Sequence, residues 1–188
     1  IICPWNFPFN VPCRKITPAL IAGNTCVLKP AQLTPGVAAE FVKLYEQAGL
    51  PAGVLNFVTG FGSGIGNELV TNRQIKAISF TGSVEVGQSI HEQAAANMTR
   101  TQLEMGGKNP IVVLADANLE DAVDSAAFAA YACAGQWCTS TSRAVVEKKV
   151  LKDFLDLLID RVKKIKVGKG AEPDTAMGPV CGESQLKN

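Results

Sequence analysis

Short apolar runs alternate with longer segments of helical spacing in the first half of the chain. The apolar runs lack strict alternation and predict strands at residues 1–3, 25–29, 54–58, 75–81 and 99–105. Apolar positions three and four apart predict helices at residues 11–22, 34–48, 65–70 and 83–96. This alternation predicts a parallel sheet covered by helices on both faces, an α/β fold of the Rossmann type.

The pattern changes at Gly106-Gly107, where we place a boundary. The elements predicted beyond it are a strand at residues 110–114, a helix over 119–134 that Asn118 caps, a strand at 143–147 and a helix at 150–164. We therefore expect two α/β parts, residues 1–105 and residues 106–188.

Composition argues against several classes of protein. The 188 residues are 47% hydrophobic and 19% charged, with a net charge of +1, which is typical of a soluble globular chain. No basic run favours nucleic acid or a membrane surface. No apolar run reaches the roughly 20 residues that cross a bilayer. We expect neither nucleic acid nor a membrane as a partner.

Cysteine and histidine usage argues against a metal site. Six cysteines are scattered without CxxC spacing, and His91 is the single histidine. The cysteines are also too sparse for a secreted disulfide scaffold, so we expect a cytoplasmic protein without a metal. Residues 1–3 look like the end of a strand whose beginning is absent, and we expect the chain to be a segment of a longer protein.

In a parallel sheet, ligands bind in loops at the carboxyl ends of the strands. The loops in question are residues 4–9, 29–34, 59–66 and 81–87. The glycines of residues 60–66 miss the G-x-G-x-x-G pattern in every register, and residues 82–87 lack the Lys-Ser/Thr that would complete a phosphate loop. A strand followed by Gly82, with Ser83 opening a helix, still makes a reasonable pyrophosphate site through backbone N–H groups.

Two side chains are candidates for chemistry. Cys138 follows the predicted helix, between Gly135 and a run of hydroxyl residues that predicts a turn. A thiol at such a turn is accessible, and a buried structural cysteine is the alternative. Glu104 lies between an apolar strand and Gly106-Gly107. This context predicts a partly desolvated carboxylate whose pKa is raised toward that of a useful base, and a solvated carboxylate is the alternative.

Five motifs together resemble the aldehyde dehydrogenase superfamily. They are Pro4-Trp5-Asn6-Phe7-Pro8, Leu28-Lys29-Pro30, Phe80-Thr81-Gly82-Ser83 with Gly87, Leu103-Glu104-Met105-Gly106-Gly107-Lys108, and Gly135-Gln136-Trp137-Cys138. Their order matches the family, as does the separation of 34 residues between Glu104 and Cys138. The resemblance covers essentially the whole chain. It implies an incomplete aldehyde dehydrogenase fold, in which an NAD(P)-binding domain (residues 1–105) joins a catalytic domain (residues 106–188).

The resemblance implies three catalytic residues. Cys138 would be the nucleophile that attacks the aldehyde carbonyl, and Glu104 would activate the water that hydrolyses the thioester. The Asn6 side-chain amide and the Cys138 backbone N–H would stabilise the oxyanion.

The resemblance also implies a cofactor, NADP or NAD. Ser83 and its helix would hold the pyrophosphate, Lys29 would contact the adenine ribose, Gly62 would lie near the adenine and Trp5 would line the cleft. The remaining implied cofactor residues are Cys3, Pro4, Gln32, Thr81, Gly82, Val86, Gly87, Glu104, Met105 and Gly106. Gln32 occupies the position where NAD-preferring members have Glu, and a neutral amide would not repel a 2′-phosphate. We therefore predict that NADP is accepted.

Within the family the chain looks most like semialdehyde dehydrogenases that act on α-ketoglutarate semialdehyde. Succinate-semialdehyde and betaine-aldehyde enzymes are the alternatives, and a homo-dimer or tetramer is expected of the full-length protein. In a CoA-acylating relative the general-base carboxylate is absent, so Glu104 argues for hydrolysis. A non-catalytic relative is disfavoured because Asn6, Glu104 and Cys138 occur together.

Overall fold

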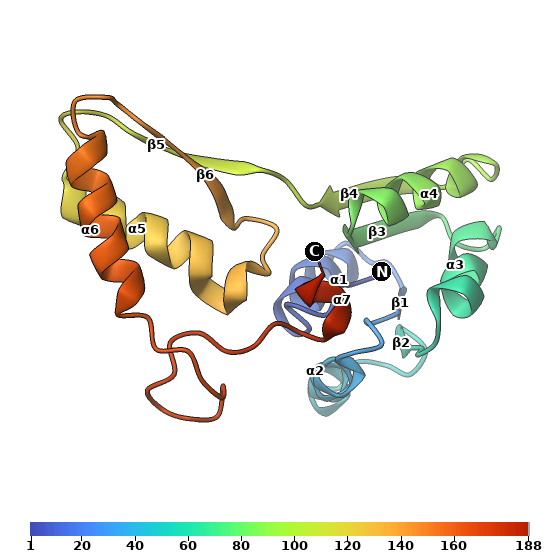
Figure 1. Ribbon diagram of the computed structural model, residues 1–188. Coiled ribbons are helices and arrows are strands. Elements are labelled where there is room, and N and C mark those ends of the chain that lie inside the picture. Colours follow the sequence, from blue (N-terminus) through green and yellow to red (C-terminus); the bar gives the residue numbers. More distant parts are fainter. Residues whose placement is uncertain (188) are drawn as a thin grey trace. The chain divides into compact units, whose positions relative to one another are not determined.

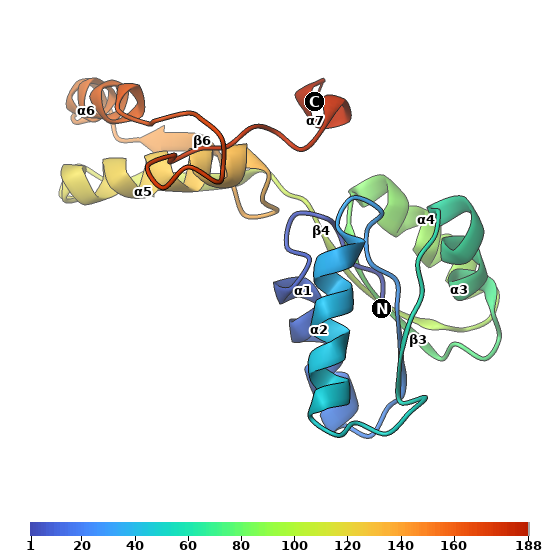
Figure 2. The same cartoon turned by 90° about the horizontal axis from the view of Figure 1, so that it is seen from below.

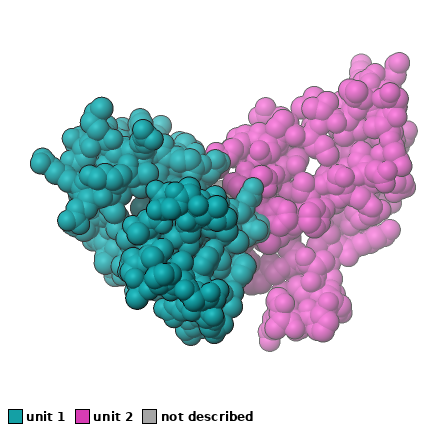
Figure 3. Space-filling view, turned by 180° about the vertical axis from the view of Figure 1, so that it is seen from behind, with its two compact units in different colours: residues 1–105 teal, residues 106–188 magenta. Residues whose placement is uncertain are grey.

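The computed structural model describes residues 1–187, which form two compact units. Unit 1 is Ile1–Met105 and unit 2 is Gly106–Asn188. Figure 3 colours them teal and magenta. Each is described here by itself.

Unit 1 alternates strands and helices (Figure 1). Its elements are α1 (Asn10–Ile21), β1 (Cys26–Leu28), α2 (Pro35–Gln47), β2 (Leu55–Phe57), the π-helical turn η1 (Gly62–Gly66), α3 (Asn67–Thr71), β3 (Ala77–Gly82), α4 (Val84–Ala95) and β4 (Arg100–Met105). The predicted helices of this unit and its strands after residue 3 are confirmed to within a few residues; the short helix predicted at 65–70 starts three residues earlier with η1. The strand predicted at residues 1–3 is not formed as such, because only Ile2 makes isolated bridges.

The strands of unit 1 run parallel, with the first residues of the chain in the middle. β1 pairs with β2, and β3 pairs with β4. Ile2 bridges both pairs, because it forms parallel bridges to Lys29 on one side and to Phe80 on the other. The Ile2 N–H donates to the Ser79 carbonyl at 2.9 Å, and the Thr81 N–H donates to the Ile2 carbonyl at 3.0 Å. The chain thus proceeds outward through β1 and β2 and then returns to the other side of residues 1–3, which makes this point the topological switch of the sheet.

Helices pack on both faces of the sheet. Ile78 and Phe80 of β3 are buried against Ile90 and Ala94 of α4. Ser79, which alternates with them and so points to the other face, accepts a hydrogen bond from Lys15 of α1. A second core cluster joins α1 and α2 to β1; Figure 2 shows these two helices side by side. Doubly covered parallel strands explain the continuous apolar runs of the sequence.

Unit 2 contains one parallel strand pair and the helices that cover it. Its elements are β5 (Asn109–Val113), α5 (Leu119–Tyr131), the 3₁₀ turn η2 (Ala132–Gly135), β6 (Thr141–Val146), α6 (Leu151–Lys163) and the short α7 (Glu183–Leu186). β5 pairs with β6, and Val113, Val123 and Phe154 form the centre of its core. Asn118 caps α5 as predicted, since its Oδ1 accepts from the N–H groups of Glu120 and Asp121. The sequence pattern did not predict α7.

One predicted helix end is wrong. The helix expected to reach residue 134 ends at Tyr131, because Cys133 and Ala134 adopt left-handed backbone angles (φ 50° and 56°). Their short apolar side chains continue the helical sequence pattern, so the break is invisible in that pattern. The start of α2 is as predicted, with Thr34 at the N-cap position; its hydroxyl makes no cap bond and donates instead to the Trp5 carbonyl at 3.3 Å. Among the described residues, no helix has both the length and the apolar character needed to cross a membrane.

Candidate active site

The Cys138 loop begins where α5 stops. Cys133, Ala134 and Gly135 all have positive φ, which turns the chain sharply away from the helix axis. Asn109, at the start of β5, closes the loop from the other side. Its Nδ2 donates to the carbonyl oxygens of Cys138 at 2.8 Å and Ser140 at 3.2 Å. The Cys138 side chain is exposed. The alternative of a buried structural cysteine is therefore wrong.

Trp137 anchors the same loop. Its ring packs edge-on against Phe128 of α5, with ring centroids 5.7 Å apart. Its backbone N–H donates to the Ser140 hydroxyl at 3.3 Å, and the Ser140 N–H donates to its carbonyl at 3.2 Å. Next to it, Gln136 Oε1 accepts from the Cys181 N–H at 2.8 Å. The residues around Cys138 are thus held by both side-chain packing and hydrogen bonds, which keeps the thiol at a defined position.

Glu104 lies near the end of β4. Thr81 of β3 is its register partner, and its carboxylate accepts a hydrogen bond from Gln102 Nε2 at 2.7 Å. The side chain is exposed, because Arg100, Gln102 and Glu104 alternate with half-buried residues along the strand. The expected partial desolvation is not observed, and the solvated alternative holds in this structure.

The loop after residues 1–3 carries Trp5 and Asn6, both half-buried. The Thr34 hydroxyl ties this loop to the start of α2 through the Trp5 carbonyl. Cys3 is 5% exposed in the core of unit 1, and burial raises the pKa of its thiol to about 11. A cofactor at this loop could therefore meet the backbone of Cys3 but not its thiolate.

A cavity of about 490 Å³ lies beside β1, η1 and α4. Lys29, Gly62 and Val86, three of the predicted cofactor residues, line it together. Lys29 is 6% exposed and donates to the Pro30 carbonyl at 3.2 Å; burial lowers the pKa of its ammonium group. Ser63, Glu85 and Ser89 also line the cavity and were missed. Their positions in the sequence could have identified them. Ser63 directly follows Gly62, and Glu85 and Ser89 lie in the first two turns of α4.

The start of α4 shows the geometry expected of an anion-binding turn. Ser83 has extended backbone angles and its Oγ accepts from the Val86 N–H at 3.3 Å, so it is the N-cap of a 12-residue helix. The first turn of such a helix offers N–H groups and the positive end of its dipole to an anion.

Gly82 and Gly87 have packing roles. A Cβ on Gly82 would lie 2.4 Å from Phe80 Cζ, and one on Gly87 would lie 2.5 Å from Met105 Sδ. Gly87 is buried, and it lets α4 approach β4 closely. The glycine spacing that suggested a phosphate loop therefore has a steric cause as well.

The structure gathers some of the predicted residues and separates others. Thr81 pairs with Glu104, and Gly82 pairs with Met105, across β3 and β4. Gln32 lies in the loop after β1 and does not line the cavity that contains Lys29. Asn6 and Glu104 belong to unit 1, whereas Cys138 and Gly106 belong to unit 2.

A doubly covered parallel sheet, a Ser83-capped helix start after β3 and an exposed loop cysteine characterise an α/β protein with a Rossmann-type sheet. The family model described as "Aldehyde dehydrogenase family" matches residues 1–188. The chain belongs to this family.

Relatives of known activity support the assignment. Alpha-ketoglutarate semialdehyde dehydrogenase of Haloferax volcanii is 46% identical over 188 residues, covering 100% of this chain and 39% of that protein. The 2,5-dioxopentanoate dehydrogenase of Saccharolobus solfataricus is 47% identical over 189 residues, with the same coverage of 100% and 39%. The crystal structure of Staphylococcus aureus betaine aldehyde dehydrogenase in complex with NAD+ has a TM-score of 0.94 at 42% identity, over 97% of this chain and 36% of that one. The chain thus spans less than two-fifths of the length of these relatives.

Proposed function

We propose that the chain is part of an NAD(P)-dependent aldehyde dehydrogenase that oxidises an aldehyde to a carboxylic acid. The observation that carries the proposal is the exposed Cys138 thiol on a loop that Asn109 and Trp137 hold in place, in a member of this family. The balanced reaction consumes aldehyde, water and oxidised cofactor and yields carboxylate, reduced cofactor and two protons. In this proposal residues 1–105 serve the cofactor and residues 106–188 carry the nucleophile.

Cys138 Sγ, as the thiolate, attacks the aldehyde carbonyl carbon and forms a thiohemiacetal. A loop thiol with an exposed side chain is accessible to a substrate carbonyl. The Asn6 amide and the Cys138 backbone N–H donate to the oxygen that becomes negative in this step. An amide donates without titrating, so this stabilisation is independent of pH.

Loss of a hydride from the carbon of the thiohemiacetal, and of its hydroxyl proton, gives a thioester. Glu104 takes a proton from the water that attacks this thioester, and the Cys138 thiolate leaves. An exposed carboxylate at the end of β4 is accessible to water, and its hydrogen bond from Gln102 leaves the second oxygen free to accept a proton.

Hydrolysis distinguishes this reaction from acyl transfer to CoA. Formation of free carboxylate without CoA is the expected result, and acyl-CoA as the product would overturn this part of the proposal.

NAD or NADP is the cofactor that the residues of unit 1 fit. The buried Lys29 ammonium lines the cavity, and the Ser83-capped start of α4 is suited to a pyrophosphate. When bound, the cofactor supplies the acceptor for the hydride that leaves the aldehyde carbon.

Gln32 supports acceptance of NADP, because it is neutral where a carboxylate would repel a 2′-phosphate. We expect kcat/KM values for NADP and NAD within a hundredfold of each other and a shift toward NAD in Gln32→Glu; a hundredfold preference for NAD in the unaltered protein would refute the Gln32 argument.

The substrate that we propose is a semialdehyde, with α-ketoglutarate semialdehyde first. The support is that two relatives, at 46% and 47% identity, are named for this substrate, since 2,5-dioxopentanoate is another name for α-ketoglutarate semialdehyde. Betaine aldehyde is the alternative, from the name of the Staphylococcus aureus enzyme, and succinate semialdehyde is another. Comparison of kcat/KM across these aldehydes and a neutral aliphatic aldehyde decides among them. Best activity on the neutral aldehyde would refute the semialdehyde proposal.

The cell compartment and the assembly are also part of the proposal. All six cysteines are free, which supports a reducing cytoplasm. A homo-dimer or tetramer is proposed for the full-length protein, and sedimentation velocity measures it.

A further inference from the structure

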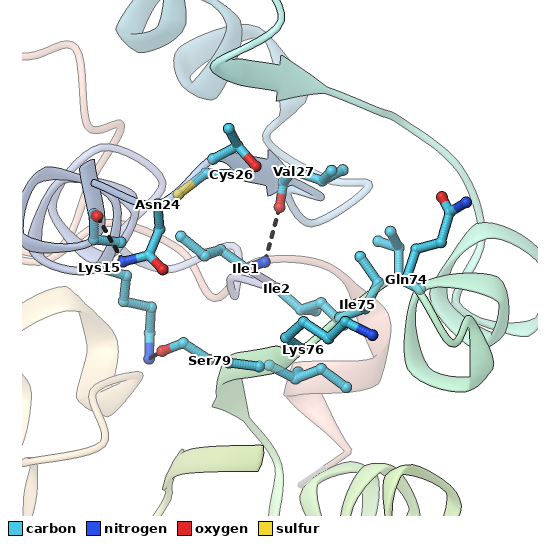
Figure 4. A pocket seen from close by; sticks show the side chains of 15 residues that line it. Ile1, Ile2, Lys15, Asn24, Cys26, Val27, Gln74, Ile75, Lys76 and Ser79 are labelled. Carbon is cyan, nitrogen blue, oxygen red and sulfur yellow. Dashed lines mark hydrogen bonds between the residues drawn. The ribbon is translucent and has the colours of Figure 1, made fainter. Parts of the chain in front are cut away.

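A chain of polar side chains in unit 1 ends on the Glu104 carboxylate. It starts at Lys15 of α1, passes through Ser79 of β3 and Gln102 of β4, and reaches Glu104. Ser79 and Gln102 are register partners on neighbouring strands, so their side chains rise side by side from the same face of the sheet. Figure 4 shows Lys15 reaching toward Ser79.

The hydrogen bonds fix which way the Gln102 amide points. Its Oε1 accepts from Lys15 Nζ at 2.9 Å and from Ser79 Oγ at 2.5 Å. Ser79 Oγ accepts in turn from Lys15 Nζ at 2.7 Å, which leaves the hydroxyl proton for Gln102. An ammonium has only donors and a carboxylate has only acceptors. The amide can therefore satisfy both neighbours only with its oxygen toward Lys15 and its Nε2 toward Glu104, where the Nε2 to Oε1 distance is 2.7 Å.

Resting on the proposed function, we infer that Gln102 is a positioning residue for the general base, and that Ser79 and Lys15 hold its amide in the one orientation that can donate to Glu104. The hydrogen bond from the Gln102 amide occupies one oxygen of the Glu104 carboxylate. It also restricts the rotamers of the exposed Glu104 side chain. The other oxygen remains available to the water that attacks the thioester. Gln102 itself does not titrate, so it neither supplies nor removes the transferred proton.

The electrostatics agree with this arrangement. Lys15 is half-buried; burial lowers the pKa of its ammonium group, while the nearby Cys3 and Glu104 raise it. The positive charge stands behind the amide oxygen and polarises the amide, which strengthens the Nε2–H donation to the carboxylate.

The experiment compares hydrolysis with the first turnover in the full-length protein. Gln102→Leu has a similar volume and neither donor nor acceptor. It is expected to lower the steady-state rate about tenfold while the first-turnover burst of reduced cofactor and the KM for aldehyde keep their values. Ser79→Ala is a smaller change and serves as the second variant if Gln102→Leu does not fold. It is expected to lower the steady-state rate about threefold. Arg100→Met is the matched control, because Arg100 is exposed on the same face of β4, and it is expected to leave both rates unchanged.

A double-mutant cycle separates positioning from a structural role. In a Glu104→Gln background, Gln102→Leu is expected to cause no further loss, because Gln102 acts only through the carboxylate. Additive losses, or equal slowing of the burst and the steady state, would overturn the inference. If Glu104→Gln alone leaves the steady-state rate unchanged, the proposed role of Glu104 as the general base is wrong. If Glu104→Gln slows the steady state but the Gln102 variants do not, only the positioning role of Gln102 is wrong.

Discussion

The amide nitrogen of Asn109 lies 2.8 Å from the carbonyl oxygen of Cys138 and so ties the start of β5 to the loop that carries the exposed thiol. Asn109 also donates to Ser140, so one side chain spans the turn around Cys138. The loop lies between the end of α5 at Tyr131 and the start of β6 at Thr141, so Asn109 and the contacts of Trp137 and Gln136 hold it outside regular secondary structure.

Replacing Asn109 is therefore expected to loosen the thiol loop. Asn109→Asp keeps the shape but points acceptors at both carbonyl oxygens, which should cost about 1–3 kcal/mol in unfolding free energy and lower kcat more than tenfold. Hydrogen exchange of residues 136–140 and urea unfolding measure the two effects. Unchanged exchange in these residues would show that Asn109 does not hold the loop.

Ser83 gives a way to separate stability from cofactor binding. Ser83→Asp retains an N-cap acceptor for the Val86 N–H and should leave the unfolding free energy within about 0.5 kcal/mol. Its negative charge lies where a pyrophosphate is proposed to bind, so the cofactor Kd should rise at least tenfold. Ser83→Asn, an equally good cap without the charge, is the control. Equal Kd values for the two variants would place the pyrophosphate elsewhere.

Gly87 should accept a side chain only at a cost in stability, because Met105 must move. Gly87→Ala brings a methyl group against Met105 Sδ and is expected to cost about 1–3 kcal/mol of unfolding free energy. The double variant with Met105→Ala should recover part of that loss. Gly62→Ala is the matched control, since a Cβ there meets nothing within 4 Å. Urea unfolding measures all three, and a Gly87→Ala protein as stable as the control would contradict the close packing of α4 on β4.

The buried Cys3 thiol predicts a particular loss of stability in alkali. Its pKa is about 11 when folded against an ordinary 9.0, because burial disfavours the thiolate. In the unfolded chain the thiol ionises first, so the stabilising contribution is complete below pH 9 and is lost as the pH rises through 11. Cys3→Ala removes this titration. The stability advantage of the unaltered protein over Cys3→Ala should therefore shrink by about 2–3 kcal/mol between pH 8 and 11. A constant advantage over that range would contradict the burial of Cys3.

The sequence was informative where local pattern and spacing carry the structure. The strands and helices of unit 1 follow from apolar runs and helical spacing because each is buried on the face that the pattern marks. The place of Cys138 after a helix and before hydroxyl residues left an accessible and a buried thiol both open, and the structure shows it exposed.

Other features depend on backbone angles and on neighbours that the local apolar pattern does not mark. The exposure of Glu104 depends on which face of β4 is left uncovered. The hydrogen bond between Ser79 and Gln102 depends on the register between β3 and β4. The end of α5 at Tyr131 depends on left-handed angles at Cys133 and Ala134, which are not glycines. The packing of Phe128 on Trp137 joins a helix to a loop nine residues away. None of these relationships leaves a periodic signal in the sequence.

The central claim is that Cys138 is the nucleophile, and Cys138→Ala in the full-length protein tests it most directly. Dehydrogenase and esterase activities should both be lost, because both pass through the same acyl-enzyme. Cys133→Ala is the control: Cys133 is also exposed, and Ala134 shows that alanine adopts the same backbone conformation. Loss of both activities in Cys138→Ala, with both retained in Cys133→Ala, is the predicted result. Survival of either activity in Cys138→Ala would contradict the account.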